Sequence, residues 1–381
     1  MIYFDNAATT FPKPAGVVRE MKRCAERYCG NPGRSSHRLS IAAAAKIYEC
    51  RDALADFFGA DKSENVVFTY NTTYALNMAI KSAVKKGDHV LISDLEHNSV
   101  LRPVSALQKA EEITYDVFPA AKKSAAETLD SIKALIKPNT RALICTHVSN
   151  VCGITLPIEE IGGLCKEKGV TFIVDAAQSA GIRNIDVKKA NIDILCAPGH
   201  KGLYGPQGTG VAVFSDGFEN ARTLVEGGNG VNSLEADMPD FLPERFEAGT
   251  PATPAIAGLS EGVRFVREIG TEEIDNKERA LAARLTDMLM GTRGVTVYAP
   301  DRIGNTVLFN IDGMSPNKAA TLFDDSDICL RSGFHCSPLA HAALGTGDDG
   351  ALRASFGYFN KNRELDAFYD RLKELIADCR I

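Results

Sequence analysis

An acid and a lysine that follow two consecutive predicted strands are the pair of residues with the clearest chemistry. Asp175 ends the apolar run 170–174, and Lys201 lies 26 residues later, in the Gly-rich stretch 197–210 after the run 192–196. In open α/β sheets, ligands bind at the carboxyl ends of the strands. Pyridoxal phosphate uses such a pair, because a lysine amine forms its Schiff base and an acid keeps its pyridine nitrogen protonated. Taken singly, Asp175 could be a helix N-cap and Lys201 a surface lysine.

Cys336 is a candidate nucleophile. It lies in CLRSGFHCSP (329–338), a loop after a predicted strand, with Arg331 and His335 close by in sequence. A positive neighbourhood favours the thiolate, the form that attacks. The alternative is that Cys336 is one more packing residue among ten cysteines.

The ten cysteines are scattered and never form CxxC, so neither a disulfide framework nor a zinc site is expected and no metal is predicted. Most should be small buried hydrophobes in a reducing compartment. They stand at 24, 29, 50, 145, 152, 165, 196, 329, 336 and 379.

A phosphate group would need donors, and the segment 71–73 could supply them. Asn71, Thr72 and Thr73 close the predicted strand 66–68 and open a predicted helix over 74–84. Hydroxyls and free N–H groups at a helix N-terminus favour an anion. An ordinary N-cap is the alternative reading.

Short apolar strands alternate with helical stretches through the first two thirds of the chain. This pattern predicts a mostly parallel sheet covered by helices on both faces. The predicted strands are 66–68, 89–92, 141–145, 170–174, 192–196 and 208–214.

The pattern changes at TPATPAIAG (250–258). A long helix over 255–290, strands at 295–297 and 306–309, and a helix over 363–379 predict a smaller α+β domain. We therefore expect a large domain over 15–254 and a small domain formed by 1–14 and 255–381.

Charge and targeting signals narrow the class of protein. The net charge of the 381 residues is −6 and no basic stripe is present, so nucleic acid is not an expected partner. The sequence has neither a signal peptide nor an apolar stretch of membrane-spanning length, which predicts a cytoplasmic protein without a membrane partner. Neither GxxxxGK[ST] nor GxGxxG occurs, which disfavours nucleotide binding.

Eight motifs in order along the chain resemble the class V aminotransferase family of fold-type I pyridoxal phosphate enzymes, and within it the cysteine desulfurases. The resemblance covers nearly the whole chain and implies a seven-stranded, mostly parallel sheet between helices plus a small α+β domain. The motifs are DNAATT (5–10), Glu96-His97, THVSNVCG (146–153), DAAQ (175–178), GHK (199–201), RFEAGTP (245–251), RSGFHCSP (331–338) and LRASFGYFN (352–360).

The resemblance assigns roles around the cofactor ring. Lys201 would form the Schiff base and then take the Cα proton of the substrate. Asp175 would pair with the pyridine nitrogen, and Gln178 would bond the ring oxygen. His97 would stack on the ring and move protons. Asn150 would lie beside the ring and the substrate carboxylate.

The resemblance also assigns roles to residues further from the cofactor ring. Thr72, Thr73 and His200 would hold the phosphate. Thr250 would reach the phosphate in the partner subunit's site, which implies a homodimer. Arg353 would clamp the carboxylate of the substrate, L-cysteine, in a bidentate fork.

In the family, the cysteine that matches Cys336 takes sulfur as a persulfide, releases alanine and passes the sulfur to an acceptor protein. Cys336 and Arg353 are 17 residues apart, which resembles the desulfurases with a short cysteine loop. Pro198 departs from the pattern, since the family often has Ser or Thr there, and its effect on the phosphate site stays open. Arg34 and His37 resemble, more loosely, a substrate-access segment.

Other readings stay open. Selenocysteine or cysteine sulfinate could be the preferred substrate. The chain could be a class V aminotransferase or epimerase in which Cys336 is incidental, or a non-catalytic sulfur-relay scaffold. The acceptor could serve iron–sulfur cluster assembly, tRNA modification or a cofactor pathway.

Overall fold

The computed structural model describes residues 1–33, 35–302 and 304–378. Its centre is the expected seven-stranded sheet, which is parallel except at one side, where β8 runs against both of its neighbours. In spatial order the strands are β2 (Val66–Thr69), β8 (Gly210–Phe214), β7 (Ile194–Pro198), β6 (Thr171–Asp175), β5 (Thr140–Thr146), β3 (Asp88–Ser93) and β4 (Ile113–Phe118).

Six of these strands overlap the runs predicted from the sequence, and β4 was missed. β4 is the edge strand, and only its first and last residues, Ile113 and Phe118, are buried, so it does not form a buried apolar run. Only its pairing with β3 identifies it.

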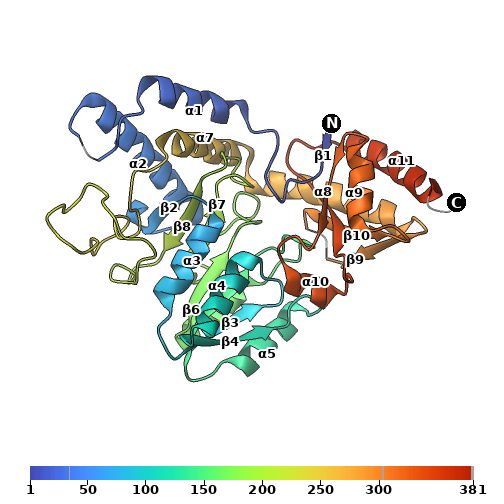
Figure 1. Ribbon diagram of the computed structural model, residues 1–381, viewed down its shortest axis with the longest axis horizontal. Helices are drawn as coiled ribbons and strands as arrows, with labels where there is room; N and C mark the ends of the chain where they lie inside the picture. Colours follow the sequence, from blue (N-terminus) through green and yellow to red (C-terminus); the bar gives the residue numbers. More distant parts are fainter. Residues whose placement is uncertain (34, 303, 379–381) are drawn as a thin grey trace.

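Helices cover both faces of the sheet, as expected (Figure 1). On one face lie α3 (Thr72–Ala83) and α4 (Asn98–Lys109). The other face is covered by α2 (Arg38–Phe58), α5 (Ala125–Leu135), α6 (Ile158–Lys168) and α7 (Thr253–Ile269). A short turn of helix, η1 (Ser63–Asn65), precedes β2, and α1 (Ala15–Arg27) packs on α7.

The C-terminal part forms a second layered unit with its own hydrophobic core. An antiparallel sheet contains β12 (Arg331–Gly333), β13 (Ala351–Ser355), β10 (Thr306–Ile311) and β9 (Val295–Tyr298). Its helices are α8 (Thr271–Met290), α9 (Pro316–Asp324), α10 (Pro338–Leu344) and α11 (Asn362–Asp378).

The N-terminal strand pairs with a strand of this second unit. β1 (Ile2–Tyr3) pairs in parallel with β11 (Ile328–Cys329), and Asp5 bridges to Ser355. Figure 1 shows the N-terminus beside α9 and well separated in space from α1 and α2, the helices that follow it in sequence.

The single helix expected over 255–290 is wrong, because the chain breaks at Gly270, whose φ is +89°. The first half, α7, packs on α1 and α2, and its residues Ile256, Leu259 and Val263 join the core of the large sheet. We therefore propose that the large domain extends to Gly270 rather than ending at 254. No helix in the described part of the chain is long and apolar enough to cross a membrane.

Candidate active site

Eight of the residues singled out in the sequence line one cavity of about 100 Å³ at the carboxyl ends of the strands. These are Thr72, Thr73, His97, Asn150, Asp175, Gln178, His200 and Lys201, and the wall is completed by Asn71, Ser99, Thr146, Ala177 and Pro198. Parallel strands bring their carboxyl ends to one edge of the sheet, which is why residues from five separate segments meet here.

Lys201 projects from a tight turn between β7 and β8. A Cβ on Gly199 would stand 2.1 Å from Oγ1 of Thr209, so only glycine fits at the start of this turn. Burial lowers the pKa of the Lys201 amine to about 8, an effect that the Asp175 carboxylate opposes and the guanidinium of Arg353 reinforces. A large fraction of the amine is therefore neutral, and nucleophilic, in mildly alkaline solution.

Asp175 is the last residue of β6 and is 3% exposed. Its Oδ1 accepts a hydrogen bond from the backbone N–H of Ala177 at 2.9 Å. Burial raises the carboxyl pKa to about 6, although this bond and the charge of Lys201 pull it down. Asp175 thus remains mostly ionised at neutral pH and can hold a positive partner in the cavity.

His97 caps α4 with its ring. Nδ1 accepts the backbone N–H of Ser99 at 3.0 Å and lies 2.8 Å from the Ser99 hydroxyl, which contacts Oγ1 of Thr73 at 2.7 Å. Burial, reinforced by the charge of Lys201, lowers the His97 pKa to about 4. The ring is therefore neutral, with its proton on Nε2.

The N-terminus of α3 forms one end of the cavity. Asn71 caps the helix by accepting the backbone N–H of Tyr74 at 2.9 Å. The hydroxyl of Thr72 is buried and has no hydrogen-bond partner among the described residues. A helix N-terminus with an unpaired buried hydroxyl has the donors that an anion requires.

The N-terminal segment closes over this cavity. Gln178 donates from Nε2 to the carbonyl of Ala7 at 2.9 Å, and Nδ1 of His200 lies 3.0 Å from the Thr9 hydroxyl. Burial lowers the pKa of His200 to about 4. The DNAATT motif (5–10) therefore covers the cavity by binding Gln178 and His200, which belong to two of the other family motifs.

Arg353 approaches from β13 of the small domain and is 1% exposed. Its Nη2 lies 2.6 Å from Oδ1 of Asp5, and its Nη1 donates to the carbonyl of Asn150 at 2.8 Å. Nε has no partner. Asp5 was missed as a functional residue, and its place in an N-terminal motif was the only available signal.

Asn150 joins the cavity to the Cys336 loop. Its Nδ2 donates to the carbonyl of His335 at 2.8 Å, and its Oδ1 accepts the hydroxyl of Ser337 at 2.8 Å. The carbonyl of Cys336 accepts the backbone N–H of Asn98 at 2.7 Å. The loop is thus fixed on both sides of Cys336, whose side chain is exposed.

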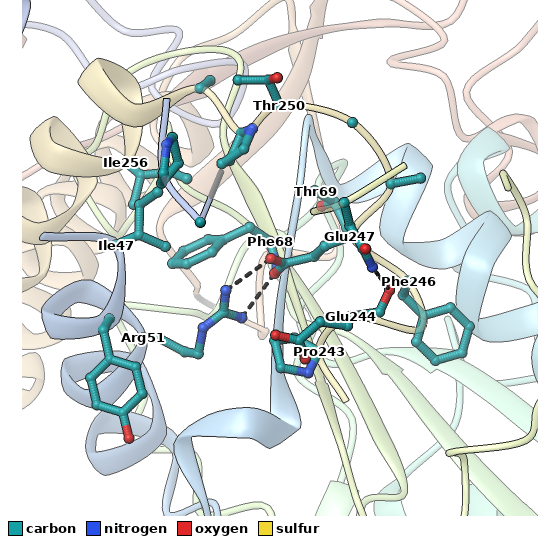
Figure 2. Close-up of a pocket in the computed structure, with 18 of the residues that line it drawn as sticks. Ile47, Arg51, Phe68, Thr69, Pro243, Glu244, Phe246, Glu247, Thr250 and Ile256 are labelled. Atoms are coloured by element: carbon teal, nitrogen blue, oxygen red, sulfur yellow. Dashed lines mark hydrogen bonds and ion pairs between the residues drawn. The ribbon is translucent and has the colours of Figure 1, made fainter. Parts of the chain in front are cut away.

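Thr250 does not lie with the other predicted residues. It is exposed and lines a different cavity of about 430 Å³ (Figure 2). There Arg51 forms a two-bond ion pair with Glu247, at 2.8 and 2.9 Å, and Glu247 accepts the backbone N–H of Phe68. These bonds tie the segment that ends in Thr250 to β2.

Two further residues were also missed: Ser99 in the cavity wall and Glu96 behind it. Ser99 orients His97, and it stands only two residues further along the chain. Glu96 is fully buried, accepts bonds from Ser93 and from the backbone N–H of Thr146, and has a pKa raised to about 8 by burial. Only the structure reveals that this carboxyl lies near Asp175.

The described cysteines differ in how far they are exposed to solvent. Cys24, Cys50, Cys145, Cys152, Cys165 and Cys196 are buried, but Cys29 is exposed and Cys329 is partly exposed. Most of the described cysteines are therefore buried, as expected, with Cys29 and Cys329 as exceptions besides Cys336. Cys379, like Arg34, lies outside the described residues, and His37 caps α2.

Comparisons with known proteins agree with this architecture. The family model for class-V aminotransferases matches residues 2–368. A probable cysteine desulfurase of Pyrococcus abyssi is 35% identical, over 100% of this chain and 95% of its own length.

Solved structures are also similar. The apo cysteine desulfurase of Thermococcus onnurineus superposes with a TM-score of 0.91 at 35% identity, over 99% of this chain and 95% of that one. An S-sulfonic acid form of a cysteine desulfurase from Escherichia coli gives 0.88 at 26% identity, over 98% and 94%. With a family model that spans almost its whole length, this chain belongs to the class-V aminotransferase family.

Proposed function

We propose that the chain is a pyridoxal phosphate-dependent cysteine desulfurase that converts L-cysteine to L-alanine and keeps the sulfur on Cys336 as a persulfide. One observation carries the proposal: Asn150 lines the cavity that holds Asp175 and Lys201, and its amide binds the residues on both sides of Cys336. The loop that carries the exposed Cys336 is thereby tied to a residue of the cavity wall. The relatives named as cysteine desulfurases support the same reading.

The residues of the cavity fit the cofactor. The unpaired hydroxyl of Thr72 and the N-terminus of α3 suit the phosphate, together with Thr73 and His200. Asp175 suits a protonated pyridine nitrogen, and Lys201 suits the aldehyde carbon. Pyridoxal phosphate bound there would supply an electron sink for the substrate carbon. Pro198 in the wall adds no backbone donor to the phosphate site.

Residues of the chain would then remove the substrate proton and hold the substrate carboxylate. Nζ of Lys201 removes the Cα proton of cysteine, and the neutral ring of His97 lies against the same space. Arg353 holds the substrate carboxylate, using donors that Asp5 and Asn150 keep in place.

In the sulfur step, the Cys336 thiolate attacks the substrate sulfur. A new S–S bond forms as the Cβ–S bond breaks, and the electron pair of the broken bond passes to the substrate. One thiol and one cysteine give one persulfide and one alanine, so no added oxidant is needed.

We also propose a homodimer that works in a reducing cytoplasm and passes its sulfur to an acceptor protein. Thr250 supports the dimer, since it is exposed and lies in a cavity separate from its own chain's site. The rim of that cavity exposes Tyr48, Tyr70 and Phe241, which a second copy would cover.

The test supplies the purified, cofactor-loaded protein with L-cysteine and a thiol reductant and measures alanine and sulfide. Equal amounts of both support desulfuration. Amino transfer to a keto acid without sulfide would identify an aminotransferase instead. Faster release of selenide or sulfite from selenocysteine or cysteine sulfinate would reassign the preferred substrate.

A further inference from the structure

Cys336 is held in an unfavourable backbone conformation. The φ angles of His335 and Cys336 are +49° and +57°, in the left-handed region that residues with side chains rarely adopt. Two successive residues in this region need support from their surroundings. The carbonyl of Cys336 is bound by the backbone of Asn98, but the imidazole of His335 points the other way, into the small domain.

A series of hydrogen bonds receives that imidazole. Nδ1 of His335 lies 3.0 Å from Nε2 of His341 in α10, and Nδ1 of His341 lies 2.8 Å from the hydroxyl of Thr346. At its other end, Nε2 of His335 lies 3.4 Å from the carbonyl of Arg331. All three side chains are buried, with exposures of 4%, 2% and 6%.

The direction of every bond in the series is determined. A carbonyl only accepts, so Nε2 of His335 carries the proton that faces Arg331. Burial lowers the pKa of both histidines, so each ring is neutral and carries one proton. Nδ1 of His335 must then accept from Nε2 of His341, and Nδ1 of His341 must accept from the Thr346 hydroxyl. The series therefore begins at the Thr346 hydroxyl, its first donor, and ends at the carbonyl of Arg331, its last acceptor.

We propose that His335, His341 and Thr346 are positioning residues for Cys336, and that their one-directional hydrogen bonds hold the loop in the conformation from which the thiol attacks. The inference rests on the proposed function and deepens it. In this proposal, Thr346, ten positions after Cys336, controls the sulfur step through two imidazole rings.

The experiment compares Thr346→Val, which keeps the shape but loses the hydroxyl, with Thr346→Ser, which keeps the donor. Three quantities are measured: bound pyridoxal phosphate, the first spectral change on mixing with L-cysteine, and the rate of alanine formation. Hydrogen exchange of the backbone amides from 335 to 341 is followed in parallel.

For Thr346→Val we expect alanine formation to fall about tenfold and the amides to exchange about tenfold faster, since a buried acceptor on His341 loses its partner. Cofactor content and the first spectral change, which precede attack by Cys336, should stay within about twofold of wild type. Thr346→Ser should match wild type in every measurement, within about twofold. If Thr346→Val does not fold, Thr346→Ala replaces it with the same expectations.

The proposal is overturned if Thr346→Val leaves alanine formation unchanged, if it lowers cofactor content to the same extent, or if Thr346→Ser behaves like Thr346→Val. If wild type makes no alanine from cysteine, the proposed function fails. In that case, hydrogen exchange in wild type and Thr346→Val tests the positioning role by itself. An unchanged exchange rate in Thr346→Val rejects that role.

Discussion

Arg353 and Asp5 form an ion pair across 348 residues of sequence, with Nη2 and Oδ1 2.6 Å apart and the arginine almost fully buried. The pair joins the N-terminal segment to β13, an inner strand of the four-stranded sheet. It also keeps a guanidinium charge beside the cavity before any substrate arrives. The proposed carboxylate clamp is thus oriented by a carboxylate of the protein itself.

Removing Asp5 should destabilise the fold. Asp5→Ala leaves a buried charge unpaired, and we expect a loss of about 3 kcal/mol in the free energy of unfolding. Asp5→Asn keeps an oxygen acceptor and should lose less than half as much. Urea unfolding of the cofactor-free proteins measures both, and equal stability of wild type and Asp5→Ala would show that the pair contributes nothing.

Attachment of pyridoxal phosphate should depend on pH through Lys201. Only the neutral amine attacks the aldehyde, and the lowered pKa makes that form abundant above about pH 8 instead of above the ordinary 10.5. The rate at which visible absorbance develops after adding the cofactor should rise with pH and level off above about 8. A rate that keeps rising up to pH 10 would contradict the burial of this amine.

The buried Glu96 should make stability fall as pH rises. Its folded pKa of about 8 exceeds the ordinary 4.5, so the folded protein binds this proton more tightly than the unfolded chain does. The contribution is complete below about pH 4.5 and is lost as pH rises to about 8, by at most about 1.4 kcal/mol per pH unit.

Glu96→Gln removes this titration. Between pH 5 and 8, the cofactor-free variant should gain stability relative to wild type as pH rises. The exposed Glu160→Gln serves as the matched control and should follow wild type. Parallel curves for wild type and Glu96→Gln would mean that Glu96 is not held protonated.

Much of this architecture follows from the sequence, and the exceptions have physical causes. The inner strands are buried on both faces, so they read as apolar runs, whereas the edge strand β4 is buried only at its first and last residues and does not. The sequence pattern alone predicts one continuous helix across Gly270, where the structure shows a break between two helices.

In the site, Asp175 and Lys201 were recognisable because parallel strands carry their terminal residues to one edge. The pairing of Asp5 with Arg353 and the bonds from Asn150 to the Cys336 loop link distant segments, and no local pattern encodes such contacts. Thr346 is a further example, since its effect on Cys336 passes through two imidazole rings.

The central claim is that Cys336, among the ten cysteines, takes the sulfur. Cys29 provides the matched control, because its thiol is also exposed and it lies in a different part of the fold. The deciding measurement is the rate of alanine formation from L-cysteine by wild type, Cys336→Ser and Cys29→Ser, each with a full complement of pyridoxal phosphate. We predict that Cys29→Ser retains the wild-type rate and that Cys336→Ser loses at least about a hundredfold, since a hydroxyl does not replace the thiolate nucleophile. A Cys336→Ser variant that makes alanine as fast as Cys29→Ser would contradict the account.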